Sequence, residues 1–174
     1  MLKIAGIRIS PRLKPWLGFV WRILFLLMVF WLFFGVIFGL NRMSGVAMDP
    51  SIKDGELMMF LRVGGDFGVN DVVLYEHDGK TEISRIVALP DQIVDVNRDG
   101  YLTVDGVVES KSAIVDVDSV SNDGASIFPM RVPSGTFFML NDNYDYGEDS
   151  RIFGAIDNSS IRGRIVTTLK VRDI

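Results

Sequence analysis

Residues 23–40 read ILFLLMVFWLFFGVIFGL and contain no charged residue. As an α-helix these 18 residues would span about 27 Å, close to the hydrocarbon core of a bilayer, which is roughly 30 Å thick. Residues 16–21 can extend the helix at its N-terminal end. The stretch therefore predicts a transmembrane helix over residues 23–41, which separates a short segment, residues 1–22, from a long one, residues 42–174.

Charge is distributed unevenly about this helix. Residues 1–42 hold 6 of the 18 Lys+Arg and none of the 22 Asp+Glu, which leaves 12 basic and 22 acidic residues, a net charge of −10, on the remainder. Because cytoplasmic flanks of membrane helices are enriched in Lys and Arg, we expect residues 1–22 to be a basic cytoplasmic segment and residues 42–174 to form an extracytoplasmic domain. An acidic domain of this kind argues against nucleic-acid binding.

A cleavable signal peptide is the alternative interpretation of the N-terminal stretch, since Gly45, Val46 and Ala47 resemble a small-residue cleavage site. The apolar stretch is longer than the usual 7–15 residues of a signal peptide, which favours a retained helix. The chain has no cysteine, so no disulfide framework supports the domain that follows.

Residues 44–174 show the pattern of a β-domain. Near the C-terminus Ile165, Thr167, Leu169 and Val171 alternate with polar or charged residues, which predicts a strand with one inward face. No helical periodicity competes with this pattern. Further strands are expected between Gly, Asp and Asn turn signals, at residues 57–62, 71–76, 81–89, 93–96, 101–104 and 136–140. Phe137 and Phe138 are neighbours in one of them, so one of the two rings is expected to face the core.

Two features suggest a metal site but are better explained as turns. Residues 95–100, DVNRDG, match the first half of a calcium-binding loop, yet the twelfth position is Gly106 rather than a carboxylate. Asp99-Gly100 and Asp105-Gly106 therefore predict hairpin turns. His77 is the only histidine and lies in a turn-like sequence, where one imidazole cannot form a metal site alone. We expect no metal and no cofactor.

Four separated blocks of sequence resemble motifs of type I signal peptidases, in the same order. Ala47-Met48-Asp49-Pro50-Ser51-Ile52 resembles Ser-Met-x-Pro-Thr-Leu, and Asn70-Asp71-Val72-Val73 resembles Gly-Asp-x-Val. Ser84-Arg85-Ile86-Val87-Ala88-Leu89-Pro90 resembles the strand that begins Lys-Arg. Asn141-Asp142-Asn143 with Asp149-Ser150-Arg151 and Gly154 resembles Gly-Asp-Asn-Arg-x-x-Ser-x-Asp-Ser-Arg-x-x-Gly. The resemblance implies a mainly β fold, a signal-peptidase-like β-sheet domain preceded by one N-terminal transmembrane helix.

The departures from the family fall at the positions that carry its chemistry. The family's serine nucleophile is activated by a desolvated, neutral lysine, which a second hydroxyl orients. The resemblance places Ala47 at the nucleophile, Ser84 at the lysine and Gly147 at the orienting hydroxyl. An alanine cannot attack a carbonyl, and a serine hydroxyl is a very poor base near neutral pH. The sequence therefore predicts a protein without peptidase activity.

The positions that shape the family's cleft are largely retained. The residues expected to line an inert peptide cleft are Ser44, Val46, Ala47, Met48, Pro50, Ser84 and Ile86. Those expected to brace it are Arg85, Asp142, Asn143, Asp149, Ser150 and Arg151. The Asp-Ser-Arg group is expected to fix one loop through charge-assisted hydrogen bonds.

Non-catalytic homologues of this kind, called SipA-type, occur in pilus gene clusters of streptococci and related Gram-positive bacteria, and this chain resembles them. The resemblance implies a chaperone or assembly factor for sortase-dependent pilus polymerisation. Its partners would be pilin subunits, a class C sortase, or both, at the cell membrane. An extended segment of a partner would bind the cleft by strand addition.

Two other functions remain open from the sequence. One is an active signal peptidase with relocated groups, with Ser44 or Ser51 as nucleophile and Asp49 or Asp91 as base, although a solvated carboxylate is a weak base for a serine hydroxyl. The other is a decoy that occupies signal peptides or competes with an active paralogue, for which the cleft and the anchor would be the same.

Overall fold

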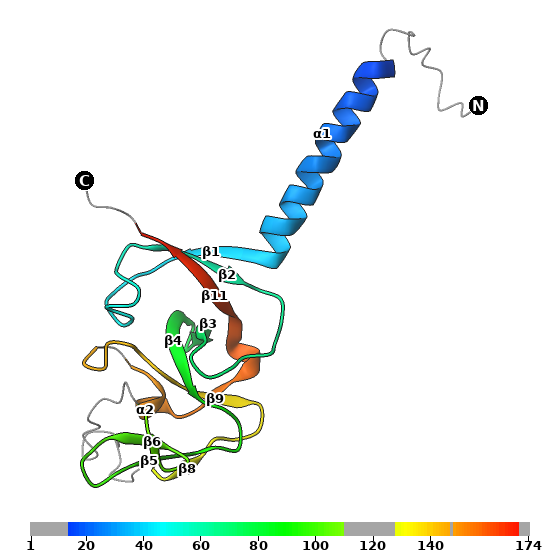
Figure 1. Ribbon diagram of the computed structural model, residues 1–174. Helices are drawn as coiled ribbons and strands as arrows, with labels where there is room; N and C mark the ends of the chain where they lie inside the picture. The colour runs from blue at the N-terminus through cyan, green and yellow to red at the C-terminus, as the bar shows by residue number, and fades with distance from the viewer. Residues whose placement is uncertain (1–13, 110–127, 147, 171–174) are drawn as a thin grey trace. The chain divides into compact units, whose positions relative to one another are not determined.

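The computed structural model describes residues 14–109, 128–146 and 148–170 and divides into two compact units, residues 1–38 and 39–174 (Figure 1). In the first unit, α1 (Lys14–Leu32) continues into one turn of π-helix, η1 (Phe33–Ile37). Within these helices, residues Gly18–Ile37 are long and apolar enough to cross a membrane, and none of them is buried. The predicted N-terminal apolar helix is thereby confirmed in kind.

The bounds of that helix differ from the prediction of residues 23–41. The helix begins at Lys14 and helical structure ends at Ile37, because Phe38 is already extended (φ −108°, ψ 150°) and begins strand β1 (Phe38–Arg42). Apolar composition runs on to Leu40, but Gly39 is buried and Leu40 is exposed, as expected for a strand rather than a helix. The apolar composition of the sequence does not show where the helix ends and strand β1 begins.

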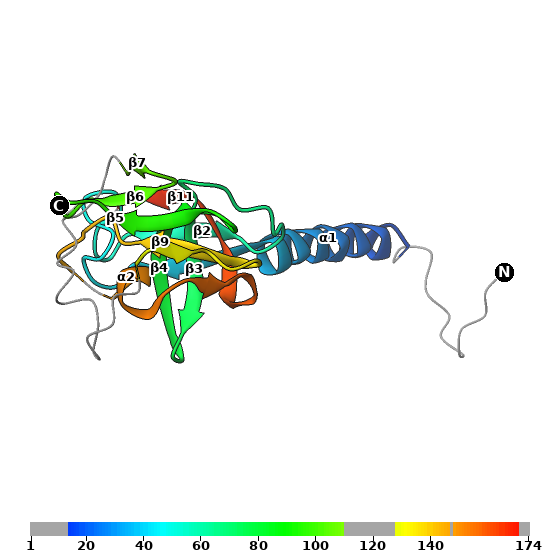
Figure 2. The same cartoon turned by 90° about the horizontal axis from the view of Figure 1, so that it is seen from below.

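The second unit is built on two antiparallel sheets. The larger sheet has the strand order β1-β2-β11-β3-β4-β9-β10 and the smaller one β7-β6-β5-β8 (Figures 1 and 2). The strands are β2 (Leu57–Leu61), β3 (Val72–His77), β4 (Lys80–Ala88), β5 (Ile93–Val96), β6 (Leu102–Val104), β7 (Val107–Val108), β8 (Met130–Arg131), β9 (Thr136–Leu140), β10 (Ile156–Asp157) and β11 (Ile161–Leu169). Two short helices, α2 (Ser150–Phe153) and η2 (Asn158–Ser160), flank β10. The mainly β prediction is confirmed.

Strand β4 is paired differently along its two halves. Against β3 it pairs over its full N-terminal part, from Lys80 opposite His77 to Arg85 opposite Val72. Against β9 it pairs only from Arg85 onward. Within the described residues, the β9-side edge of residues 80–84 therefore has no strand partner.

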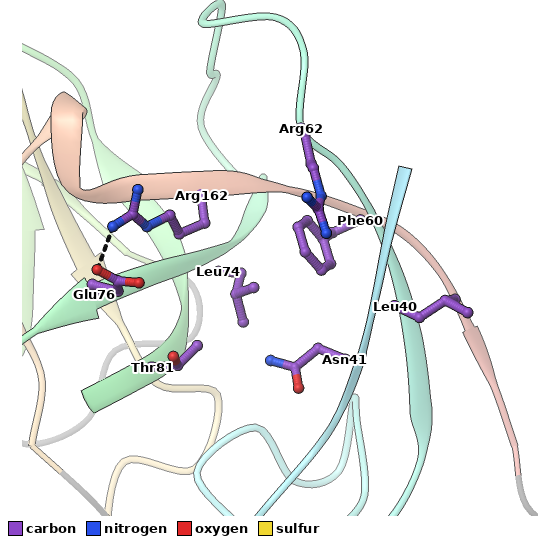
Figure 3. Close-up of a pocket in the computed structure, with 8 residues that line it drawn as sticks. All are labelled: Leu40, Asn41, Phe60, Arg62, Leu74, Glu76, Thr81 and Arg162. Atoms are coloured by element: carbon purple, nitrogen blue, oxygen red, sulfur yellow. Dashed lines mark hydrogen bonds and ion pairs between the residues drawn. The ribbon is translucent and has the colours of Figure 1, made fainter. Parts of the chain in front are cut away.

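Strand β1 is an edge strand of the same sheet, four places from β4 in the strand order. Residues of β1 and β4 nevertheless line the same two hollows, one of which is shown in Figure 3. The larger sheet is therefore curled so that β1 faces the open half of β4. Gly39 permits this packing, since a Cβ at that position would lie 2.2 Å from the ring of Phe60 on β2.

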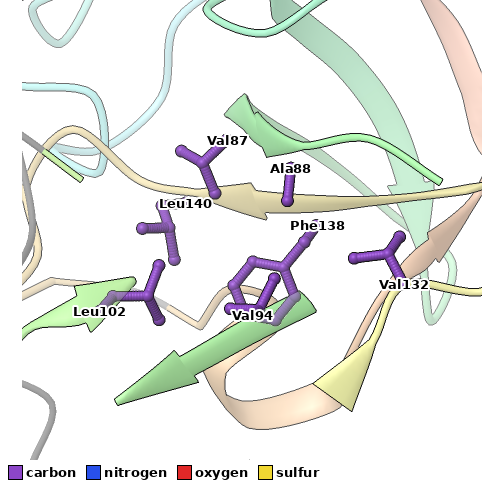
Figure 4. Close-up of a cluster of buried hydrophobic side chains, with 7 residues drawn as sticks. All are labelled: Val87, Ala88, Val94, Leu102, Val132, Phe138 and Leu140. Atoms are coloured by element: carbon purple, nitrogen blue, oxygen red, sulfur yellow. The ribbon is translucent and has the colours of Figure 1, made fainter. Parts of the chain in front are cut away.

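Hydrophobic side chains fill both faces of the larger sheet. Phe138 and Leu140 pack with Val94, Leu102 and other residues of the smaller sheet in the cluster of Figure 4. Phe137 lies on the opposite face in a second cluster. The prediction that one of Phe137 and Phe138 faces the core is confirmed, and the structure buries the other as well, because β9 has a core on each side. A third cluster lies beneath the loop between β1 and β2.

Both predicted hairpin turns are present. Gly100 (φ 82°) lies in the turn between β5 and β6, and Asp105 and Gly106 (φ 51° and 80°) form the two-residue turn between β6 and β7. The alternation predicted near the C-terminus is interrupted by a register shift between Ile165 and Thr167 in the pairing with β2. Leu169 consequently lies exposed rather than inward, and Val171 lies outside the described residues.

Candidate functional site

Ala47 lies in the loop that joins β1 to β2. It is half-buried and packs against the cluster that contains Met48 and Ile83. Its carbonyl oxygen accepts a hydrogen bond from the backbone N–H of Asn143 (2.9 Å), and the carbonyl of Val46 accepts one from Asn143 Nδ2 (3.0 Å). The loop is thus fixed by Asn143, and the side chain at position 47 offers only a methyl group.

Ser84 is fully buried on β4 and engaged on two sides. Its Oγ donates to Asn141 Oδ1 (2.8 Å) and lies 3.1 Å from the hydroxyl of Tyr75. Asn141 Nδ2 in turn donates to the carbonyls of Tyr146 (3.1 Å) and Glu148 (3.4 Å). The place where the family resemblance expects a lysine is therefore occupied by a closed network of neutral groups.

Neither hydroxyl of this network can act as a base near neutral pH. Burial raises the pKa of Tyr75 to about 12, an effect that its hydrogen bond with Ser84 offsets only in part. The phenol therefore stays protonated, and a serine hydroxyl does not ionise in this range.

Arg85, which follows Ser84, points to a different partner. Its guanidinium forms a bidentate ion pair with Asp142 (Nε to Oδ1 2.8 Å, Nη2 to Oδ2 2.5 Å) and donates to the carbonyl of Asn70 (2.9 Å). The hydrogen bond with Asp142 is the main reason why the pKa of Arg85 is raised, so the side chain remains a cation. These contacts tie β4 to the segment after β9, where the sequence predicts that Arg85 braces the cleft.

The predicted bracing by Asp149, Ser150 and Arg151 is also present. The fully buried carboxylate of Asp149 accepts bonds from Arg151 Nε (2.8 Å) and Nη2 (2.9 Å) and from the backbone N–H of Asn141 (3.1 Å). Ser150 Oγ accepts a bond from the backbone N–H of Met139 (3.0 Å). Together these contacts hold the loop after β9 against its own strand.

Three consecutive residues after β9 therefore organise the site. Asn141 binds Ser84, Asp142 binds Arg85, and Asn143 binds the loop that carries Ala47. The structure thus ties the nucleophile and lysine positions to one segment. The third expected position, Gly147, lies outside the described residues.

A cavity of about 210 Å³ adjoins Ala47. Ser44 and Ala47 line it from the loop, and Thr81, Glu82 and Ile83 line it from the open half of β4. Asn41, Arg42 and Met43 complete its wall. This cavity contacts Ala47, the position that the resemblance assigns to the nucleophile.

Five of the residues predicted to line the cleft do not line the cavity. Met48, Ser84 and Ile86 are fully buried, so they support the site from within the core instead of facing the cavity. Pro50 is exposed and Val46 half-buried, and neither is part of the cavity lining. The motif preserves residues that build the cleft as well as those that face it, and the sequence pattern does not separate the two groups.

Glu82, Tyr75 and Asn141 were missed as site residues. Glu82 lies two positions before Ser84, so strand periodicity places it on the same side of β4 as Ser84. Asn141 stands where the family pattern has glycine, a difference that indicates added volume at this point. Tyr75 had no sequence signal, because its contact with Ser84 depends on the register of β3 and β4.

The groups considered for a relocated active site do not come together. Ser44 is exposed and lines the cavity, whereas Ser51, Asp49 and Asp91 are not part of its lining. Asp91 lies in the turn between β4 and β5 with φ 69°. Glu82 is the acidic residue that lines the cavity together with Ser44.

The described residues contain no group of three His, Cys, Asp or Glu side chains able to hold a metal ion. In the former calcium-loop candidate, Asn97 Oδ1 accepts the backbone N–H groups of Asp99 (3.0 Å) and Tyr101 (2.9 Å), so it serves the turn. The ring of His77 packs against Phe153, with centroids 4.1 Å apart.

Comparisons with known proteins find relatives of one kind, which are described as signal peptidases. A family model described as "Signal peptidase, peptidase S26" matches residues 16–169. The chain is 29% identical over 131 residues to signal peptidase I of Bacillus licheniformis (69% of this chain and 70% of the relative), and 29% identical over 138 residues to signal peptidase I V of Bacillus subtilis (71% and 81%). A crystal structure of a signal peptidase I from Enterococcus faecalis matches with a TM-score of 0.43 and 25% identity, over 59% of this chain and 97% of that one.

Proposed function

Because the chain belongs to the signal peptidase, peptidase S26, family, we propose that it is a membrane-anchored member that binds an extended peptide without cleaving it. One observation carries this proposal: the residue at the lysine position, Ser84, is held inside a neutral network by Tyr75 and Asn141. No base is available there to activate a nucleophile, and Ala47 provides no nucleophile.

The site retains the features that binding requires. An extended segment that enters the cavity at Ala47 meets the unpaired edge of β4 over residues 80–84. Main-chain hydrogen bonds to such an edge supply affinity, and the cavity supplies a pocket for a side chain. Peptide binding therefore survives the loss of the reacting groups.

The biological role that we propose is that of a chaperone or assembly factor in sortase-dependent pilus polymerisation. Its support is the resemblance to SipA-type homologues together with the degenerate dyad. The partners would be pilin subunits or a class C sortase, bound by the domain on the extracellular side while the N-terminus is cytoplasmic. A tether to the same membrane as the partners raises their effective concentration, so weak intrinsic affinity suffices.

The first test separates binding from catalysis. The full chain, purified in lipid nanodiscs, is incubated with a secretory preprotein, and products are followed by mass spectrometry. We expect no cleavage of the preprotein and reversible binding of its extended signal segment. Cleavage at a defined bond, abolished by Ser44→Ala or Ser51→Ala, would overturn the proposal.

The second test addresses the pilus. Deletion of the gene should abolish pilin polymers and leave precursor processing intact. Wild-type protein should restore polymers, and so should the exposed control variant Arg98→Gln, whereas Ala47→Phe should not because its side chain fills the cavity. A deletion that alters precursor processing but leaves polymers unchanged would instead identify the decoy function.

An active peptidase is the second candidate function. The cavity places Ser44 and Glu82 on one surface, and the matched relatives are named signal peptidases. Under this alternative, Glu82→Gln and Ser44→Ala would each abolish preprotein cleavage while peptide binding persists. Asp49→Asn and Asp91→Asn serve as matched controls, because neither side chain lines the cavity.

A further inference from the structure

We propose that a second hollow, beside the cavity at Ala47, is a subsite that selects an acidic side chain of the bound peptide through Arg62. This inference rests on the peptide binding proposed above and adds its specificity. The hollow has a volume of about 440 Å³ and is large enough for one long side chain together with solvent.

Its floor is apolar. Phe60 of β2 and Leu74 of β3 are both buried members of the cluster beneath the Ala47 loop, and Figure 3 shows both side chains at the hollow. Such a floor favours the aliphatic part of a glutamate side chain over a free inorganic anion, because it removes apolar surface from water.

Its rim carries one cation that is not neutralised. Arg162 forms an ion pair with Glu76, and that hydrogen bond lowers the pKa of Glu76, so both are ionised at neutral pH (Figure 3). Arg62 is exposed, and its guanidinium lies 5.5 Å from the centroid of the Phe60 ring. Among the described residues it has no carboxylate partner, which leaves the rim with a net charge of +1.

Two further donors face the same space. Asn41 Oδ1 accepts the backbone N–H of Arg42, and its Nδ2 donates to no group in the described residues. The hydroxyl of Thr81 is likewise without a hydrogen bond within the described part of the chain. In Figure 3 both side chains lie beside Leu74, opposite Arg62. A carboxylate therefore meets hydrogen-bond donors on two sides of the hollow.

The hollow adjoins the cavity at Ala47. Asn41 and Thr81 line both spaces, and both are bounded by β1 on one side and by the open half of β4 on the other. An extended peptide directs every second side chain to the same face. One side chain can thus enter the cavity at Ala47 while another, an even number of residues away, reaches Arg62.

The experiment uses the full chain in lipid nanodiscs and labelled octapeptides of Ala, Val and Ser whose ends are acetylated and amidated. Glutamate is placed at each position in turn, and a matched series carries glutamine. Fluorescence anisotropy gives the Kd of each peptide. We expect one position at which glutamate binds about tenfold more tightly than glutamine, as for a charge-assisted hydrogen bond.

The preference should vanish in Arg62→Gln, persist in Arg62→Lys and be unchanged in Arg98→Gln, which removes an exposed cation of the smaller sheet. Raising NaCl from about 50 mM to about 500 mM should reduce it in the wild-type protein, because the pair is open to solvent. A preference that survives Arg62→Gln, or that requires a free C-terminal carboxylate in place of the side chain, would refute the subsite. Peptides that bind without any acidic preference would refute the subsite alone, whereas the absence of all peptide binding would refute the proposed function as well.

Discussion

At the level of single residues, the side chain of Asn141 determines how the space around position 84 is used. Its amide accepts from Ser84 and donates to two carbonyls of the following loop. Tyr75 closes the same space from β3. The space around position 84 is therefore filled by neutral groups that satisfy one another, which is how buried polar atoms avoid a desolvation penalty.

Restoring the dyad alone should fail for this reason. In the double variant Ala47→Ser, Ser84→Lys, the longer side chain must displace Asn141 or Tyr75, which overpacks the core and lowers the free energy of unfolding by about 1–3 kcal/mol. We expect no cleavage of a preprotein by mass spectrometry. Adding Asn141→Gly should recover most of the lost stability, measured by thermal unfolding of the full chain. Cleavage by the double variant would contradict the interpretation that Asn141 and Tyr75 occupy the space that a lysine at position 84 would need.

The buried phenol of Tyr75 predicts a dependence of stability on alkaline pH. Its pKa is about 12 in the folded protein against 10.0 for an ordinary tyrosine. Unfolding therefore releases a proton between these values, so the free energy of unfolding falls as pH rises from 10 to 12, by at most about 1.4 kcal/mol per pH unit. Below pH 10 this effect is absent.

Tyr75→Phe should flatten the slope of stability against pH in that window, measured by urea denaturation at several pH values. Tyr144, whose pKa burial also raises to about 12, should account for part of the remaining slope. Tyr101→Phe, at an exposed position, is the matched control and should leave the slope as in the wild type. An unchanged slope in Tyr75→Phe would refute the assignment.

At the level of elements, the larger sheet depends on close backbone contact between β2 and β11. Gly163 of β11 lies so near β2 that a Cβ would be 2.3 Å from the carbonyl oxygen of Leu61. A backbone atom cannot move aside as a flexible side chain can. This glycine therefore fixes how tightly β2, and with it β1 and the hollow at Phe60, is held to the rest of the sheet.

Gly163→Ala should lower the free energy of unfolding by about 3 kcal/mol, because it forces β2 and β11 apart. Denaturant titration of the full chain measures the change. Gly65→Ala is the matched control, since a Cβ there meets no atom within 4 Å. Equal stability of the two variants would contradict the close packing.

Sequence patterns predicted most elements of this sheet, and their failures have physical causes. Strands with clear turn signals, such as β5 and β9, lie at the predicted residues. Strand β1 was missed because it continues an apolar run that also suits a membrane helix. The short strands β7, β8 and β10 are two residues each, too short for a period to be visible.

The candidate site was likewise predictable from the sequence only in part. The ion pairs of Asp142 and Asp149 follow from motif residues and were predicted as bracing. The roles of Tyr75 and Asn41 depend on strand register and on the curl of the sheet, which are long-range properties. A motif therefore locates the site, but residues outside the motifs determine what it can bind.

At the level of the whole molecule, the described clusters of buried hydrophobic residues belong to the β-unit. All three clusters of buried hydrophobic residues lie between Met43 and Ile156, within the β-unit. The segment Gly18–Ile37 carries mainly exposed apolar side chains together with one exposed charged side chain, that of Arg22. By length and composition, this segment is able to span a membrane.

The proposed orientation can be tested directly, because the chain contains no cysteine. We expect Asp99→Cys, at the tip of the β5–β6 hairpin, to react with a membrane-impermeant maleimide on intact cells. Ser10→Cys, in the basic segment, should react only after the membrane is permeabilised. Labelling of Ser10→Cys in intact cells would reverse the orientation.

The network around Ser84 also affects which substitutions the protein can accept at this position. A lysine placed at position 84 would meet Asn141 and Tyr75, so we expect a less stable protein without a gain in hydrolysis. If the proposed function holds, a single substitution toward the dyad costs stability without adding activity, even though the fold of the domain is that of a peptidase family. Under the proposed function, this network stabilises the present site against stepwise acquisition of a catalytic dyad, while the cavity at Ala47 stays open to a peptide.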